Sequence, residues 1–163
     1  MMNDPHILDS VEAARERVSR LGCASYPDQP IVATNGNFDL LHYGHVHLLR
    51  FCRQRVGGYL FVAVDDDEQV REQKGALRPI FPLKERLASL AAIRYVDFVF
   101  PFHGDVAEVY AILRPDIIVK GREWKGNVAG AKYARRVIYA PNYPRRQKLS
   151  SADIIQRLLK ENR

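Results

Sequence analysis

Two histidines three residues apart are the side chains of this sequence best placed to do chemistry. His42 and His45 flank Gly44 in an H-x-G-H signature that follows a short apolar run, residues 31–34. Residues three apart share one helix face, so both imidazoles would lie in the first turn of a helix that begins at His42. Backbone N–H groups and the positive dipole end favour an anion there. The pattern therefore predicts a site for a nucleotide's phosphates, with Gly36 and Gly44 admitting them close to the backbone.

Two other interpretations of the histidines compete with this one. They could be half of a metal site, or a solvated helix face without a role. A metal site needs further ligands, and neither Cys23 nor Cys52 has a second cysteine or histidine at zinc-finger spacing. The frame G-x-F-D-x-x-H-x-G-H, after a strand and before an amphipathic helix, favours the nucleotide site, and we predict no metal-binding residues. His47 should point away from the phosphate face, and we interpret it as structural.

Length and composition predict one globular domain. The 163 residues would form a single domain, with a helix and connector over 1–30 and a catalytic core over 31–163. No apolar run approaches the roughly 20 residues that span a bilayer, and the first residues do not form a secretory signal, so no membrane partner is expected. Two distant cysteines form no disulfide framework, which predicts a cytoplasmic protein.

The net charge of +6 suits an anionic ligand. The densest basic cluster, residues 145–148, lacks the interleaved aromatic residues of a single-strand binding platform. We therefore expect small anions rather than nucleic acid, with Arg145 and Arg146 as ligands on a lid over residues 145–151. Binding of RNA stays an alternative that would show strong salt dependence.

Strands and helices are expected to alternate along the chain. The predicted fold is α/β, a doubly wound, Rossmann-like five-stranded parallel sheet with helices on both faces. Ligands of such sheets bind at the carboxyl ends of strands, where the H-x-G-H and Lys120-Gly121 both fall. The expected strands are 31–34, 60–64, 98–101, 117–120 and 137–140, and the expected helices are 10–21, 42–55, 67–73, 83–93, 105–113 and 151–160.

Several motifs resemble those of the nucleotidylyltransferase superfamily, over nearly the whole chain from Ile31 to Leu159. The resemblance rests on residues 34–46, which hold Asn35, Gly36, Phe38 and the H-x-G-H, on Lys74-Gly75 with Arg78-Pro79 and Arg86, on residues 93–97, on Val119-Lys120-Gly121, on Trp124 with Gly126, and on Ser150-Ser151. The chain departs from the family pattern at Ala152, where a threonine is usual. It also departs at residues 122–124, Arg-Glu-Trp, where the heptose-phosphate branch has a glycine, an acid and a tyrosine.

The resemblance implies a reaction in which an acceptor phosphate attacks the α-phosphorus of a nucleoside triphosphate and releases pyrophosphate. His42, His45 and Lys74 would be catalytic and stabilise the phosphates. The nucleotide would be bound by Asn35, Gly36, Phe38, Gly44, Arg86, Lys120, Gly121, Arg145, Arg146, Ser150 and Ser151. For Arg86 and the serines, the simpler readings are an exposed arginine and a helix cap.

The implied partners are ATP or CTP, a small sugar or polyol phosphate, and a second copy of the chain in a homodimer. Mg²⁺ would be held mainly by phosphate oxygens, with Asp39 and Asp67 as available carboxylates, although Asp67 also suits a helix N-cap. An ADP-forming, heptose-1-phosphate-like activity is favoured slightly over a CDP-forming, glycerol-3-phosphate-like one. A nucleotide-binding module without turnover is the further alternative.

Overall fold

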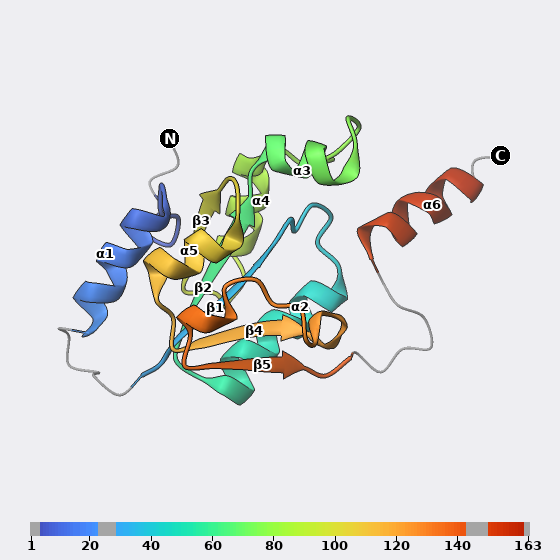
Figure 1. Cartoon of the computed structure of the whole chain (residues 1–163). Coiled ribbons are helices and arrows are strands. Elements are labelled where there is room, and N and C mark those ends of the chain that lie inside the picture. Colours follow the sequence, from blue (N-terminus) through green and yellow to red (C-terminus); the bar gives the residue numbers. More distant parts are fainter. Residues whose placement is uncertain (1–3, 23–28, 143–149, 162–163) are drawn as a thin grey trace.

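A parallel five-stranded sheet forms the centre of the protein (Figure 1). The computed structural model describes residues 4–22, 29–142 and 150–161. The strand order is β3-β2-β1-β4-β5, so the chain moves outward in one direction from β1 to β3 and then returns to add β4 and β5 on the other side. The strands are β1 (Ile31–Gly36), β2 (Tyr59–Asp65), β3 (Phe98–Phe102), β4 (Ile117–Gly121) and β5 (Arg136–Ala140).

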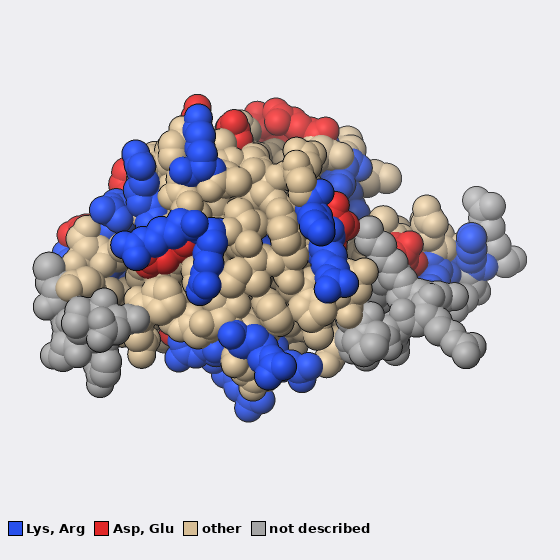
Figure 2. Space-filling view, turned by 60° about the horizontal axis from the view of Figure 1, so that its bottom comes forward, with Lys and Arg blue, Asp and Glu red and all other residues tan. Residues whose placement is uncertain are grey.

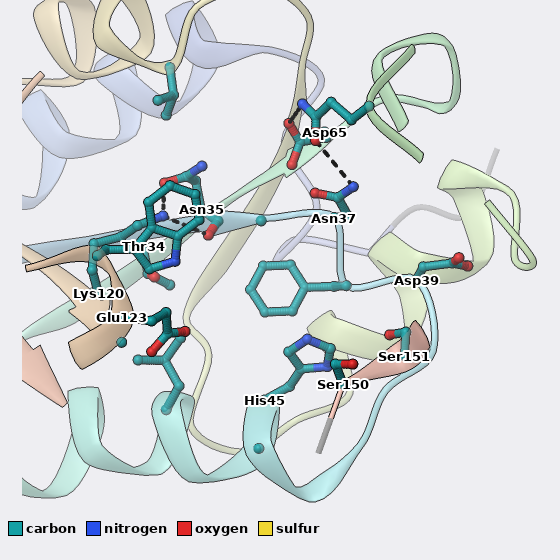
Figure 3. A pocket seen from close by; sticks show the side chains of 18 of the residues that line it. Thr34, Asn35, Asn37, Asp39, His45, Asp65, Lys120, Glu123, Ser150 and Ser151 are labelled. Atoms are coloured by element: carbon teal, nitrogen blue, oxygen red, sulfur yellow. Dashed lines mark hydrogen bonds between the residues drawn. The ribbon is translucent and has the colours of Figure 1, made fainter. Parts of the chain in front are cut away.

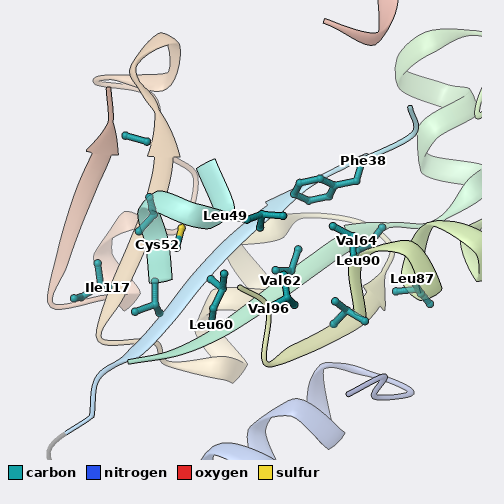
Figure 4. Close-up of a cluster of buried hydrophobic side chains, with 14 residues drawn as sticks. Phe38, Leu49, Cys52, Leu60, Val62, Val64, Leu87, Leu90, Val96 and Ile117 are labelled. Carbon is teal, nitrogen blue, oxygen red and sulfur yellow. The ribbon is translucent and has the colours of Figure 1, made fainter. Parts of the chain in front are cut away.

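Helices cover both faces of this sheet, as the sequence predicted. Alternate side chains of each inner strand enter opposite cores: Val32 of β1 faces the helices α2 and α4, whereas Ile31 and Ala33 face α1 and α5. Figure 4 shows the first of these cores. The helices are α1 (Val11–Gly22), α2 (Tyr43–Phe51), α3 (Asp67–Lys74), α4 (Leu83–Ala91), α5 (Val106–Leu113) and α6 (Ser151–Glu161), with short 3-10 turns η2 (Arg122–Trp124) and η3 (Ala131–Tyr133).

The helix predicted over residues 42–55 changes from α-helical to π-helical winding after Phe51. After α2 the chain continues as a π-helical segment, η1 (Cys52–Val56), which closes with a hydrogen bond from Gly57 N to Cys52 O. Gly57 then adopts a positive φ of 79°, which suits glycine and ends the helix. Cys52 is buried in the core next to the sheet, as expected of a structural cysteine.

The cap predicted for the third helix is displaced by one residue. Asp66 rather than Asp67 caps α3, because its carboxylate accepts a hydrogen bond from Gln69 N at 2.8 Å. Asp67 instead accepts from Leu83 N at 2.8 Å and so caps the following helix, α4. The two adjacent carboxylates thus tie α3 and α4 into one unit.

The strands β1 and β4 part early. β1 pairs with β2 along its whole length, from Ile31 to Gly36, but pairs with β4 only at Val32 and Ala33. Beyond these two residues a crevice opens between β1 and β4, at the point where the strand order reverses. This is where open α/β sheets bind their ligands. In the described part of the chain, no helix is both long and apolar enough to cross a membrane.

Candidate functional site

A cleft of about 1220 Å³ lies at the carboxyl edge of the sheet. Figure 3 shows it from close by, with Lys120, Asn35 and Glu123 on one side, Asp65 and Asn37 on another, and His45, Ser150 and Ser151 on a third. The cleft brings together most of the residues predicted from sequence: Asn35, Gly36, Phe38, His42, Gly44, His45, Lys74, Lys120, Gly121, Ser150 and Ser151 all line it. The geometric expectation of one shared cleft is therefore confirmed.

The two signature histidines form the first turn of α2. His42 is the N-cap residue, and its Nδ1 accepts a hydrogen bond from Gly44 N at 3.1 Å. Nδ1 of His45 lies 3.5 Å from His42 N and completes a reciprocal cap. The two rings stack with centroids 3.8 Å apart. The cap thereby holds both imidazoles side by side in the predicted position.

This capping arrangement also sets where the ring protons lie. In both rings Nδ1 accepts a backbone N–H, so a neutral imidazole must carry its proton on Nε2. Burial and the adjacent His42 lower the pKa of His45 to about 3, and partial burial lowers the pKa of His42 against an opposing effect of Asp153. Both rings are thus neutral at pH 7 and offer one Nε2–H each.

Phe38 packs against the ring of His45. It is 3 % exposed, its ring centroid lies 5.1 Å from that of His45, and its backbone adopts a φ of 48°. A non-glycine residue with positive φ is held there only by surrounding packing. A Cβ at Gly36 would lie 3.4 Å from the Phe38 ring, which is an ordinary van der Waals contact, so the packing of Phe38 does not itself require glycine there. The contribution of Phe38 to the cleft is therefore to position His45.

Lys120 crosses the crevice between β4 and β1. Its Nζ donates to Asn35 Oδ1 at 2.8 Å, and the hydroxyl of Tyr110 donates to the same oxygen at 2.9 Å. Nζ also lies 4.7 Å from the ring centroid of Trp124, a cation–π contact. Burial lowers the pKa of Lys120 to about 8, while Asp65 and Glu123 oppose that change. Lys120 is thus a buried cation whose charged form two carboxylates of the site favour.

The start of α6 faces the histidines. Ser150 Oγ accepts from Asp153 N at 3.1 Å, while Ser150 N donates to Asp153 Oδ2 at 3.0 Å. The alternative of a capping role for Ser150, with Asp153 as partner, is thus confirmed. Ser151 Oγ donates to Leu40 O at 3.3 Å and ties the helix to the loop before α2. The N-terminal ends of two helices meet at the cleft, where both favour an anion.

The remaining predicted residues fall into three groups. Lys74 is exposed at the end of α3, on the rim of the cleft. His47 was expected to point away from the phosphate face but borders the cleft, where its Nε2 lies 3.1 Å from Pro141 O and joins α2 to the chain after β5. Arg145, Arg146 and most of the lid predicted over 145–151 lie outside the described residues.

Arg86 differs from both interpretations of its sequence position. It is 1 % exposed and does not line the cleft, so it is not a surface arginine. Its guanidinium donates to the carbonyl oxygens of Phe81, Asn37 and Asp65 and to the carboxylate of Asp67. These internal acceptors replace the phosphate that we expected it to clamp. Its function here is to join the ends of β1 and β2 to α3.

The family of the chain follows from comparison with known proteins. Residues 33–157 match the family described as cytidylyltransferase-like. This chain belongs to the cytidylyltransferase-like family. It is 43% identical over 126 residues to the bifunctional protein HldE of Alkalilimnicola ehrlichii, an alignment that covers 77% of this chain and 24% of that protein. The corresponding protein of Sodalis glossinidius is 38% identical over 81% of the chain and 26% of its own length.

Solved structures agree with this assignment. The lipopolysaccharide core biosynthesis protein from Thermoplasma volcanium superimposes with a TM-score of 0.52 at 27% identity, covering 82% of this chain and 89% of that one. The pantoate-beta-alanine ligase of Francisella tularensis shares the fold at a TM-score of 0.59 and 14% identity, over 91% and 75% of the two chains. The chain spans about a quarter of the length of the curated relatives that it matches. It is a nucleotidyltransferase.

The carboxylates expected to assist Mg²⁺ in this cytidylyltransferase-like protein are already engaged. Asp39, 2 % exposed, accepts from Arg78 Nε, Ile80 N and Phe81 N, and Asp67 accepts from Leu83 N and Arg86. Across residues 4–22, 29–142 and 150–161, no three His, Cys, Asp or Glu side chains gather as a metal site would require. The donor set therefore fits an ion held by phosphate oxygens rather than by a protein cage.

Sequence reasoning missed one side of the cleft. Asp65, Gln69 and Gln73 line it, and none was among the expected site residues. The available signal was their position: Asp65 ends a buried strand, and Gln69 and Gln73 follow at helical spacing of four. The same rule that selected Lys120 applies to Asp65.

Proposed function

We propose that this nucleotidyltransferase transfers AMP from ATP to the phosphate of a heptose 1-phosphate or a closely similar sugar phosphate, with release of pyrophosphate. The observation that carries the proposal is the convergence of two neutral Nε2–H donors, the buried cation Lys120 and the start of α6 on one cleft. The identity to HldE proteins supports ADP formation over the CDP-forming alternative.

The chemistry requires positioning rather than a protein nucleophile. The acceptor phosphate is itself the nucleophile, and charge develops on the leaving pyrophosphate. Nε2–H of His42 and of His45 would donate to the α- and β-phosphate oxygens as that charge grows. Because both rings are neutral before binding, they provide hydrogen bonds without repelling the approaching cation that accompanies a triphosphate. Lys74 on the rim would reach the phosphates from the opposite side.

Mg²⁺ is the expected cofactor. It would be coordinated mainly by the oxygens of the triphosphate and would neutralise part of their charge, as is general for phosphoryl transfer. The side chains nearest to the phosphate path are histidines and a lysine, which hold the phosphates rather than the ion. The cytoplasm, where nucleoside triphosphates are made, is the expected compartment.

One experiment tests this proposal directly. The protein is incubated with Mg²⁺, each of ATP, CTP, GTP and UTP, and a panel of sugar and polyol phosphates that includes heptose 1-phosphate and glycerol 3-phosphate, and pyrophosphate is measured. We expect release with ATP and a sugar 1-phosphate, and much less with CTP and glycerol 3-phosphate. Reactions without acceptor give the background. Release at background level for every pair would leave a nucleotide-binding module, and would overturn the proposal.

We propose in addition that the protein is a homodimer. The loop between α3 and α4 exposes three large apolar side chains, Leu77 at 90 %, Ile80 at 48 % and Phe81 at 44 %. Large apolar side chains exposed together on one short loop favour association. Light scattering coupled to size exclusion should give twice the chain mass, and Leu77→Asp should shift it toward the monomer. A monomeric mass at micromolar concentration would contradict this part.

A further inference from the structure

Asp65 ends β2 at the floor of the cleft. It is 4 % exposed and borders the cleft at the side opposite Lys120 (Figure 3). Burial raises the pKa of Asp65, against opposing effects of Gln73, Gln69 and Lys120. An ionised carboxylate that is buried normally needs a cation beside it. Among the described residues, no lysine or arginine forms an ion pair with Asp65.

Two glutamines of α3 hold the carboxylate in place. Gln69 Nε2 donates to Asp65 Oδ1 at 2.7 Å, and Gln73 Nε2 donates to the same oxygen at 3.3 Å. Gln69 is itself fixed by Gly104, whose N–H donates to Gln69 Oε1 and whose carbonyl accepts from Nε2 at 3.1 Å. Asn37 Nδ2 donates to Gln73 Oε1 at 3.3 Å. Both side-chain bonds of Asp65 end on Oδ1, and no side chain among the described residues donates to Oδ2.

The cleft therefore has two chemically different sides. The side formed by α2, α6 and Lys120 presents N–H donors and positive charge, which suit phosphates. The side around Asp65 presents a carboxylate and carboxamides, with Lys74 at the rim, at the end of α3. A carboxylate repels a phosphate, but it accepts strong hydrogen bonds from hydroxyl groups. An uncharged hydrogen-bond donor therefore fits beside Asp65. Such a donor would be part of the molecule whose phosphate reacts near the histidines.

A nucleobase amino group is the competing donor, and the aromatic residues of the cleft argue against it here. Bases are bound by stacking as well as by hydrogen bonds. Trp124, 46 % exposed, offers an open aromatic surface next to Lys120, which Figure 3 shows apart from Asp65. Phe102, near Asp65, is only 7 % exposed. The hydroxyl groups of a polyhydroxylated acceptor match the surroundings of Asp65 better than a base does.

We propose that Asp65 is the residue that selects the acceptor, accepting hydrogen bonds at Oδ2 from the hydroxyl groups of a sugar or polyol phosphate, with Gln69 and Gln73 as its positioning residues. This inference rests on the proposed function and adds to it the group that distinguishes one acceptor from another. Removal of the carboxylate should therefore weaken use of the acceptor and leave use of the nucleotide intact.

The variant Asp65→Asn tests this directly. Asparagine can keep Oδ1 toward Gln69 and Gln73, and it places an amide donor where the oxygen Oδ2 was. With the acceptor that gives the highest pyrophosphate release, kcat/KM for that acceptor should fall roughly tenfold to a hundredfold, as expected for a lost hydrogen bond to a charged group. KM for the triphosphate should stay within about twofold. Singly deoxygenated analogues of the acceptor should identify one hydroxyl whose removal costs the wild type much more than the variant.

Asp66→Asn is the matched control. Asp66 is the neighbouring carboxylate, but it caps α3 and does not line the cleft, and asparagine also caps helices well. Its kinetic constants should stay near those of the wild type. An unchanged kcat/KM for the acceptor in Asp65→Asn, or a selective rise in KM for the triphosphate, overturns the inference while the proposed function stands. Absence of pyrophosphate release by the wild type with every acceptor overturns both.

Discussion

Lys120 Nζ donates a hydrogen bond to Asn35 Oδ1 at 2.8 Å across the place where β1 and β4 separate. The two strands share a ladder only at Val32 and Ala33, so this side-chain bond replaces backbone pairing beyond that point. The same oxygen accepts the Tyr110 hydroxyl, which brings α5 into the arrangement. A cation that we expect to bind phosphate is thereby part of what holds the crevice at its width.

The charge of Lys120 should give the activity an alkaline limit. Because the pKa of Lys120 is lowered to about 8, its ammonium group loses its proton as pH rises through that value, and its attraction for phosphate is lost. We expect kcat/KM for the triphosphate to decline above about pH 8. Lys120→Arg keeps the charge and should abolish that decline, whatever its absolute rate. Glu123→Gln removes a group that raises the pKa and should move the decline to lower pH. An identical alkaline decline of kcat/KM in the wild type, Lys120→Arg and Glu123→Gln would contradict this assignment.

Each signature histidine should be worth about two orders of magnitude in turnover. We expect His42→Ala and His45→Ala to lower kcat about a hundredfold, the typical effect of removing one oxyanion donor. His42 also caps α2, so His42→Asn serves as the companion variant, since asparagine retains the cap but is too short to replace Nε2–H. Stopped-time pyrophosphate assays and thermal unfolding should show full stability in His42→Asn with turnover still low. Recovery of turnover by that variant would assign His42 a capping role only.

Acid should destabilise the protein through His45. Its pKa is about 3 in the folded protein and 6.5 for the unperturbed group, so the unfolded chain binds more protons between these values. The free energy of unfolding should therefore fall as pH drops below about 6.5 and continue to fall toward pH 3. His45→Gln should flatten that part of the profile in urea titrations. An equally steep profile in the variant would place the acid sensitivity elsewhere.

Loss of Arg86 should be among the most destabilising single changes. Arg86→Met leaves three carbonyl oxygens and the Asp67 carboxylate without their donor, and breaking a buried ion pair costs about 3–5 kcal/mol. Arg53→Met is the control: Arg53 pairs with Asp97, its side chain is 41 % exposed, and pairs of that kind contribute about 0–1 kcal/mol. Urea unfolding measures both. Similar losses in the two variants would contradict the central position of Arg86.

The loop that carries Trp124 depends on Gly130. A Cβ at Gly130 would lie 2.9 Å from Tyr110 Cδ2 and 3.0 Å from Ala107 Cα, and φ is 72°. Gly126 of the same loop has a φ of 87° but open space around its Cβ position. Gly126→Ala should cost only the strain of a left-handed residue, about 1–2 kcal/mol. Gly130→Ala should exceed it by roughly 1–3 kcal/mol for overpacking and also reduce activity, because Tyr110 bonds Asn35 at the cleft. Equal effects would show that the loop does not rest on α5.

The sequence predicted the sheet and the signature site because both are local patterns. Strands buried on two faces are continuously apolar, and His42 and His45 are placed by helical spacing alone. What it could not predict depends on partners distant in sequence. Arg86 reaches Asn37, 49 residues away, and Asp39 reaches the main chain at Ile80, 41 residues away, and neither residue type reveals such acceptors or donors. Asp65 was missed for the same reason, since only the fold shows that the end of β2 brings its carboxylate to the cleft.

The basic side chains on one face of the molecule stand in separate groups. On the face shown in Figure 2, lysine and arginine side chains predominate over acidic ones and stand in separate groups rather than in one continuous band. The cleft residues predicted from the motif are spread over β1, α2, β4 and α6 and converge only in three dimensions.

The early parting of β1 from β4 bears on how proteins of this shape can diversify. Residues after the last shared pair contribute to the cleft but not to the ladder between these two strands, so their side chains can be exchanged without removing those backbone hydrogen bonds. The turn η2, which holds Arg122, Glu123 and Trp124, lies beyond that point and is exposed. Substitutions there should be nearly neutral for stability while altering which ligand is accepted. Descendants of one ancestral scaffold could in this way change substrates at little risk of unfolding.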